Sequence, residues 1–198
     1  MRHSSHRLGA AVVITAALFS LLALAQALWI PAKAELAQWL IQRNWQAVRN
    51  GESAAPPWPW ADTRAAARLQ VPALSEELIV LAGNSGRNLA FGPVFDNASA
   101  GMEDLVIHGH RDTHFAFLQE LKVGDELELE RPDSTRRYVV EASEVVDSRR
   151  RELVLEPGLS RLSLVTCYPF DSPFSGGELR YVVTAVADIS PRSASSGG

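Results

Sequence analysis

The fold of this chain is clearest in residues 122–130, which read KVGDELELE. Glutamate and leucine alternate through the end of this stretch, and successive side chains of a β-strand point to opposite faces of its sheet. A strand here buries Leu127 and Leu129 and leaves the glutamates in water. The KVGD sequence ahead of it supplies a turn, so the stretch predicts a half-buried strand of a β-sheet domain.

Runs of the same kind extend in both directions from this stretch. We expect eight short strands, at residues 67–71, 78–82, 89–95, 104–110, 126–130, 137–146, 162–167 and 179–186. Helical signal in this region is weak apart from a short turn at 115–121. Short strands with turn residues between them predict an all-β domain, a closed or nearly closed barrel with short helices, over residues 65–190.

The N-terminal region differs from the rest of the chain. Residues 8–32 carry no charged side chain and are long enough for a helix that crosses a bilayer. Arg2 and Arg7 precede this run, which favours a cytoplasmic location for residues 1–7. The sequence therefore predicts a transmembrane helix, or uncleaved signal anchor, at 8–32. The alternative is a cleaved signal peptide with its cleavage site at AQA, and both readings place the remainder outside the cytoplasm.

Residues 33–64 are expected to form a helix followed by a Pro/Trp linker. Leu36, Trp39 and Leu40 have near-helical spacing, and the GESAAPP sequence that follows is typical of a linker. The PWPW sequence at 57–60 cannot be helical throughout, because proline disfavours helix in the residue before it. We expect it to dock the linker onto the barrel. The tail at 191–198, PRSASSGG, is expected to be disordered.

Composition limits the classes of function. The chain is 46% hydrophobic and 21% charged, which is ordinary for a globular protein. Its formal net charge is −4 and it has no basic stripe, so nothing favours nucleic acid as a partner. The single cysteine cannot form an intramolecular disulfide. In an exported protein such a thiol is either buried and inert or retained for its chemistry.

Three residues can carry that chemistry. The strand predicted at 162–167 ends at Cys167, which places the thiol at a strand tip. A nucleophilic thiol needs a nearby base or positive charge, and His110 can serve as that base and later return its proton to a leaving amine. Arg180 is near the start of the last predicted strand. A hairpin from Cys167 to Arg180 brings the arginine charge beside Cys167, where an oxyanion would form.

The sequence around these residues resembles the sortase family. GHRDT at 109–113, followed by VGD at 123–125, is similar to the histidine segment of sortases. LVTC at 164–167 resembles their TLxTC signature, with Ser163 where the first threonine usually stands, and Arg180 matches the arginine that follows. The compact size, the anchor and the PWPWAD lead-in resemble most the sortases of Gram-negative bacteria. GHRDT is also similar to class D enzymes of Gram-positive bacteria.

The resemblance implies an eight-stranded sortase-type β-barrel and a two-step acyl transfer. Cys167 attacks a carbonyl in a C-terminal, LPxTG-like sorting motif of a partner protein, forms a thioester and passes the acyl group to an amine. His110 is the acid and base, and Arg180 the electrophilic stabiliser. No metal or organic cofactor is needed. The protein would sit in the bacterial cytoplasmic membrane by a single span in lipid, with its catalytic domain outside, in the periplasm of a Gram-negative cell.

Three further residues are candidates for substrate binding or for a supporting role. His108 rivals His110 as the base, because residues two apart on a strand share a face. The resemblance selects His110, which leaves His108 as a neighbour that packs or hydrogen-bonds nearby. Thr166 is expected to point away from Cys167 and to act through packing or its backbone. Asp112 either orients an imidazole or lies exposed in a turn.

Two other functions compete with this reading. A catalytically inactive, membrane-tethered sortase-like domain would bind a partner through the same barrel. A metal-dependent hydrolase would use His108, His110 and His114, whose pattern superficially resembles an HxHxDH zinc motif. Thr113 breaks that spacing, and no histidine follows His114 to supply a further ligand.

Overall fold

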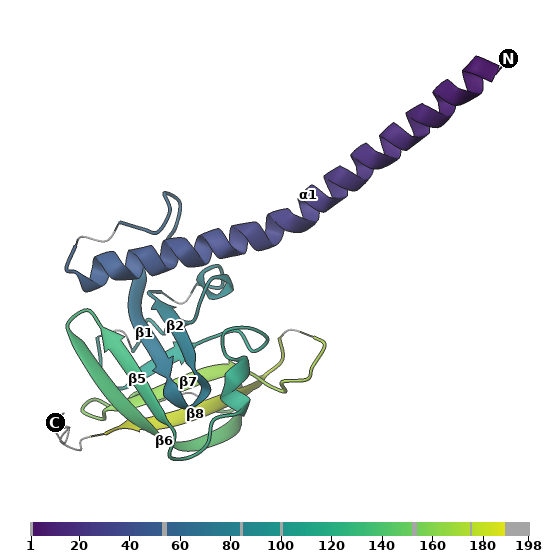
Figure 1. Ribbon diagram of the computed structural model, residues 1–198. Coiled ribbons are helices and arrows are strands. Elements are labelled where there is room, and N and C mark those ends of the chain that lie inside the picture. Colours follow the sequence, from purple (N-terminus) through teal and green to yellow (C-terminus); the bar gives the residue numbers. More distant parts are fainter. Residues whose placement is uncertain are drawn as a thin grey trace, which may run out of the picture. The chain divides into compact units, whose positions relative to one another are not determined.

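The computed structural model describes residues 2–52, 55–83, 85–99, 101–151, 154–174 and 176–188 (Figure 1). The predicted tail at 191–198 lies outside these residues, as does part of the linker. The chain divides into two compact units, Met1–Trp39 and Leu40–Gly198. The first holds most of a long helix, and the second holds the barrel.

A single α-helix, α1 (Arg2–Arg49), includes the predicted span at 8–32 and the helix expected after it. Pro31 lies inside this helix, although a proline removes one backbone hydrogen bond from a helix interior. Within the first unit, large apolar side chains such as Phe19 and Ile30 are about three-quarters exposed, each at 74%. By its length and composition α1 is a candidate membrane-spanning helix.

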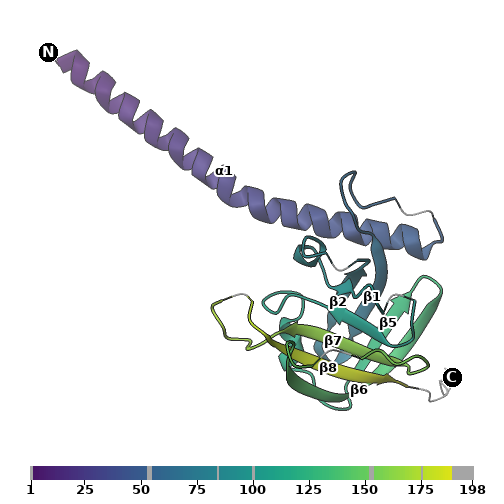
Figure 2. The ribbon, with the colours of Figure 1, turned by 180° about the vertical axis from the view of Figure 1, so that it is seen from behind.

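Eight strands form one closed barrel, which confirms the predicted fold class. They are β1 (Ala65–Val71), β2 (Glu76–Leu81), β3 (Val94–Phe95), β4 (Leu105–His108), β5 (Glu126–Arg131), β6 (Ser134–Asp147), β7 (Arg161–Cys167) and β8 (Leu179–Ala187). The order around the barrel is β1-β2-β3-β4-β7-β8-β6-β5. Figure 2 shows β7 beside β8, the pair on which the candidate site depends.

Within the described residues, three short 3₁₀ helices accompany the strands: η1 (Pro72–Leu74), η2 (Asn88–Ala90) and η3 (Ala116–Gln119). The prediction of a strand at 89–95 is wrong for its first part, because η2 continues to Ala90 and only β3 is a strand. The N–H groups of Asn88 and Leu89 both donate to the Ser85 carbonyl, which closes a turn in place of a ladder. Local turn chemistry thus outweighs the apolar character of this run.

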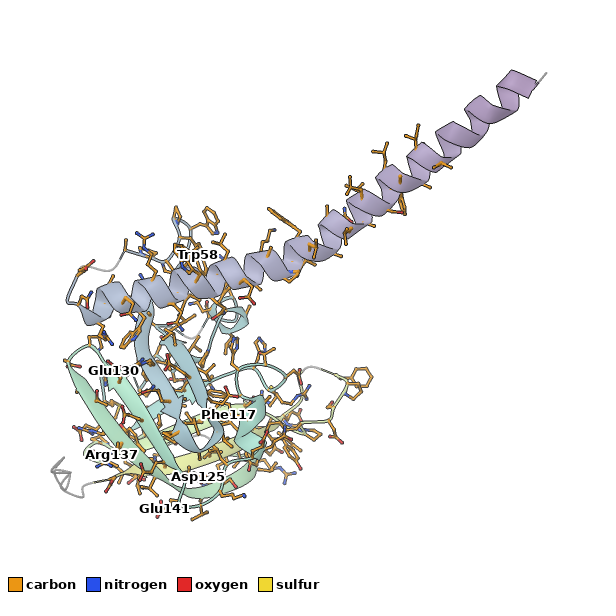
Figure 3. All side chains as sticks on the ribbon, viewed as in Figure 1. Trp58, Phe117, Asp125, Glu130, Arg137 and Glu141 are labelled. Carbon is orange, nitrogen blue, oxygen red and sulfur yellow. The ribbon has the colours of Figure 1, made fainter. Side chains whose placement is uncertain are left out.

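The barrel core is apolar and is supplied by alternate residues of its strands. Leu127 and Leu129 are 0% and 1% exposed, as their alternation with glutamate predicts. Each buried side chain of this size stabilises the fold by about 1.5–3 kcal/mol. Phe115 and Phe117 belong to the same core cluster and come from the turn at η3, where Figure 3 labels Phe117.

The linker docks on the barrel within the second unit, as expected. Trp58, which Figure 3 labels, meets the ring of Phe91 edge-on, with 4.9 Å between centroids. Trp45, from the end of α1, is fully buried in a cluster with residues of β1, β2 and β3. The Asn44 side chain accepts a hydrogen bond from the Ala65 N–H at 2.8 Å. These contacts fix the start of β1.

Candidate active site

Strand pairing brings the three candidate residues to one end of the barrel. β4 runs parallel to β7, with His108 opposite Val165. β8 runs antiparallel to β7, with Arg180 opposite Cys167. All of β7 between its two end residues is buried, and Cys167 at its tip is partly exposed. The register therefore places Arg180 directly beside the thiol.

A hydrogen-bonded joint ties the residue before His110 to the residue before Cys167. Beyond the end of β4, the Gly109 N–H donates to the Val165 carbonyl at 3.1 Å. The buried Thr166 hydroxyl donates to the Gly109 carbonyl at 2.8 Å. The joint therefore holds both functional segments in register, and the Thr166 side chain has a partner that sequence reasoning did not foresee.

Gly109 has no room for a side chain at this joint. A Cβ added there would lie 2.5 Å from the ring of Phe115, and that ring is fully buried. The Phe115 N–H donates to the His110 carbonyl at 2.9 Å, so the ring supports the turn that presents His110. Close approach of backbone and ring therefore requires glycine here.

We expect Thr166→Val to destabilise the barrel by about 1–3 kcal/mol, because the buried Gly109 carbonyl loses its donor. Thr166→Ser keeps the hydroxyl and serves as the matched control. Urea unfolding of the two variants and the wild type measures the free energies of unfolding. A valine variant as stable as the wild type would show that this hydrogen bond contributes nothing.

One cavity of about 430 Å³ collects most of the candidate side chains. It is lined by Cys167, His110 and Arg180, and by the supporting candidates His108 and Thr166. Its remaining wall comes from Leu89, Asp96, Gly109 and Val165. The structure therefore brings together a sulfur, an imidazole and a guanidinium from three separate parts of the sequence.

Arg180 is held by the backbone of its own hairpin. Its Nη1 donates to the Gly177 carbonyl at 2.8 Å and to the Leu179 carbonyl at 2.9 Å. Among the residues that the structure describes, no acceptor takes a hydrogen bond from its Nε or Nη2. One edge of the guanidinium is thus fixed, and donors remain for an oxygen that enters the cavity.

A second cavity, of about 310 Å³, adjoins the first. Both are lined by Asp96, His108, Val165 and Arg180. The second has an apolar floor made of Val106, Val146, Leu155, Val165 and Val182. Nε2 of His108 lies 3.1 Å from a carboxylate oxygen of Asp96, so this imidazole is paired where the two cavities meet.

Asp112 does not line either cavity, and its carboxylate pairs with Arg111. The Arg111 Nε and Nη2 donate to its two oxygens at 2.7 and 3.0 Å. This pairing holds the pKa of Asp112 below its usual range. Arg111 itself is only 5% exposed. Sequence reasoning missed it, because an arginine in a turn normally reaches solvent and the GHRDT pattern carries no sign of burial.

The burial of His114 predicts that stability depends on pH. Burial lowers the pKa of His114 below its ordinary value of 6.5, and the neighbouring His110 lowers it further. Below about pH 6.5 the unfolded chain takes up this proton before the folded one, so stability is lost as the pH falls. We expect His114→Gln to reduce the loss of unfolding free energy between about pH 7 and pH 5. Urea titrations at both pH values test this, and equal losses in the two proteins would contradict it.

The three histidines of the metal-hydrolase alternative do not form a ligand set. Within the described parts of the chain, no group of three or more histidine, cysteine, aspartate or glutamate residues is placed to hold a metal ion. His108 is engaged by Asp96, and Nδ1 of His114 lies 3.3 Å from the Thr113 hydroxyl. The geometry therefore lends no support to that alternative.

Comparison with known proteins points to one family. A sortase domain model matches residues 69–188. Sortase D of Bacillus subtilis (strain 168) is 29% identical over 119 residues, which cover 58% of this chain and 60% of that protein. The chain thus spans about 60% of the length of this curated relative.

Solved sortase structures share the fold. Sortase C1 of Streptococcus agalactiae superposes with a TM-score of 0.57 at 20% identity, over 64% of this chain and 69% of that one. A lid mutant of sortase A from Corynebacterium diphtheriae gives 0.57 at 21% identity, over 82% and 98%. The domain match covers more than half of the sequence and contains Cys167, His110 and Arg180, which line the cavity. The chain belongs to the sortase family.

Proposed function

We propose that this protein is a membrane-anchored cysteine transpeptidase that cleaves an LPxTG-like C-terminal sorting motif of a partner protein and transfers the acyl group to an amine. The observation that carries the proposal is the shared cavity, which Cys167, His110 and Arg180 all line. Membership of the sortase family supports the reaction type. These three residues are far apart in the sequence, so their meeting in one cavity supports a shared catalytic role.

The first half-reaction forms a thioester. His110 accepts the proton of the Cys167 thiol, and the thiolate attacks the backbone carbonyl carbon of the motif. The negative oxygen of the tetrahedral intermediate accepts hydrogen bonds from the free edge of Arg180. When the C–N bond breaks, His110 returns the proton to the leaving amine and the acyl group stays on sulfur.

The second half-reaction releases the acyl group. An incoming amine attacks the thioester carbonyl, and its proton passes to His110. Arg180 again stabilises the oxyanion as it forms. The C–S bond then breaks, the sulfur recovers its proton from His110, and a new amide bond leaves the site. Water in place of the amine would give hydrolysis through the same steps.

The adjoining cavity supports a peptide substrate with an aliphatic side chain. Its apolar floor suits the leucine of an LPxTG-like motif, and burial of such a side chain is worth roughly 1.5–3 kcal/mol. Since both cavities share Val165 and Arg180, an extended peptide can fill the apolar one while its scissile carbonyl lies over Cys167.

The proposed location is the bacterial cytoplasmic membrane. α1 supplies a span of sufficient length to contact lipid, and Arg2 and Arg7 favour a cytoplasmic N-terminus. The catalytic domain then lies outside the cytoplasm, in the periplasm if the cell is Gram-negative. The compact size and the PWPWAD lead-in favour the Gram-negative type of sortase, and GHRDT favours a class D relationship.

Full-length protein in detergent micelles tests the proposal. With a fluorescent LPATG peptide and hydroxylamine we expect a peptide hydroxamate that ends at the threonine, and an acyl adduct on Cys167 in the intact mass. A panel of LPxTG-type peptides that yields neither product, together with a thiol inert to iodoacetamide, would favour the non-catalytic binding domain.

A further inference from the structure

Arg111 is a charged residue that the proposed chemistry does not use, yet its side chain is almost wholly buried. Besides its ion pair with Asp112, it makes two hydrogen bonds to a distant segment. Nη1 donates to the Pro169 carbonyl at 2.7 Å, and Nη2 donates to the Ser172 carbonyl at 2.9 Å. A buried charge costs stability unless it is paired and hydrogen-bonded, and this guanidinium meets both conditions.

The two carbonyls belong to the segment that follows the nucleophile. Arg111 comes directly after His110 in the sequence, and Pro169 comes shortly after Cys167. The guanidinium therefore connects the chain behind the imidazole to the chain behind the thiol. The hydrogen bond between Thr166 and Gly109 connects the residues that directly precede Cys167 and His110. His110 and Cys167 are thus held from both sides.

The segment behind Cys167 has left the β-ladder, so this connection matters. The Tyr168 N–H still donates to the Leu179 carbonyl at 3.1 Å. Farther along, the ring of Phe170 contacts that of Tyr181 edge-on, with 5.2 Å between centroids. Phe174 then reaches solvent and is 78% exposed. Arg111 supplies the polar anchor that ties this loop to the turn at His110.

Neighbouring groups stabilise the positive charge of Arg111. The hydrogen bonds that Arg111 donates to Asp112 are the main cause that raises its pKa, and negative charge at Cys167 and Asp171 acts in the same direction. Asp112, in turn, balances the guanidinium and orients its fork toward the loop.

We propose that Arg111 is a positioning residue for acyl transfer, which clamps the backbone after Cys167 to the turn after His110 and so keeps the thiol and the imidazole in place over one cavity. The inference rests on the proposed function of these two groups. Asp112 acts through Arg111, as the carboxylate that holds the guanidinium in its clamping orientation.

Two substitutions and a control test the clamp in the full chain. Arg111→Met removes every hydrogen bond of the clamp, and we expect kcat to fall about 30–100-fold with little change in KM, because a misplacement of about 1 Å costs that much in rate. Arg111→Lys keeps the charge but loses the planar fork, so we expect an intermediate loss. Arg68→Met is the control, since it breaks the partly buried pair with Glu130 away from both cavities.

The kinetic readout separates positioning from general stability. Rates are divided by the folded fraction from circular dichroism, so that a variant which merely unfolds shows no change per folded molecule. Unchanged kcat in the lysine variant, or an equal loss in the Arg68→Met control, overturns the clamp. If the methionine variant does not fold, Arg111→Lys and Asp112→Asn decide, with a smaller loss of kcat expected in each.

A second measurement is independent of catalysis. Chymotrypsin cleaves after aromatic residues that are not followed by proline, and the clamped loop carries two such residues, Phe170 and Phe174. We expect Arg111→Met to be cut there at least about 5-fold faster than the wild type and the control, because opening of this segment costs less free energy. If Arg111→Met is cleaved faster but the wild type turns over no peptide, the structural clamp is supported and the proposed function fails. Equal cleavage in all three proteins overturns the clamp itself.

Discussion

Cys167→Ala is expected to abolish acyl transfer, with peptide cleavage reduced about 10⁴-fold or more, because no other group in the cavity can form the thioester. The substitution removes one sulfur at a partly exposed strand tip, so the barrel should keep its stability. The hydroxylamine assay measures the loss of hydroxamate, and intact mass spectrometry measures the loss of the acyl adduct. Retention of either product would exclude Cys167 as the nucleophile.

Cys167→Ser is the companion to this variant. It replaces the sulfur with an oxygen of similar position, so the cavity keeps its shape while the nucleophile becomes much weaker at neutral pH. We expect both variants to bind an LPxTG-type peptide with nearly the affinity of the wild type, as measured by fluorescence anisotropy. Loss of binding in both variants would mean that the substitutions disturb the cavity, so that the loss of activity could not be assigned to the nucleophile.

Arg180→Lys should lower kcat about 10²–10³-fold despite the conserved charge, which is the range seen when one oxyanion donor is removed. In the structure Nη1 is fixed by the Gly177 and Leu179 carbonyls, which leaves the rest of the planar fork for the substrate oxygen. An ammonium is a single point that cannot hold both carbonyls and also reach into the cavity. The lysine side chain is also shorter, so it can bind either the two backbone carbonyls or the substrate oxygen, but not both.

Single-turnover kinetics of acylation measure this effect directly. Because the oxyanion forms only along the reaction path, we expect kcat to fall with KM nearly unchanged. Arg149→Lys is a suitable control, since Arg149 lies on the exposed turn after β6 and pairs there with Glu178. Full activity in Arg180→Lys would remove Arg180 from the mechanism and would point to backbone N–H groups as the oxyanion donors.

Much of the barrel was predictable, because its strands are short apolar runs that either alternate with polar residues, as in β5, or are bounded by turn residues. The glutamate–leucine pattern of β5 gave the buried face correctly, and β7 and β8 begin and end within a residue of their predicted limits. The run at 89–95 misled, because apolar residues there serve a 3₁₀ turn stabilised by short-range hydrogen bonds. Periodicity cannot distinguish such a turn from a short buried strand.

The sequence could name residues that line the candidate cavity, but it could not give the hydrogen bonds that connect their segments. A thiol at a strand tip, an imidazole after a glycine and a distant arginine carry chemical meaning in the sequence alone. The hydroxyl of Thr166 and the guanidinium of Arg111 instead act on backbone carbonyls far away in sequence. Any residue offers a carbonyl, so no pattern of side chains marks these partners.

Closure of the barrel restricts how a partner protein can be recognised. Many peptide-binding domains add their ligand as an extra strand at an open sheet border, and main-chain hydrogen bonds then supply the affinity. A closed barrel presents no such border. For the proposed peptide substrate we therefore expect selectivity to come from side-chain identity at a few positions, so a scrambled peptide with equal tendency to extend should not compete. An inhibitor should accordingly mimic an aliphatic side chain and carry an electrophile, with a β-strand backbone adding little.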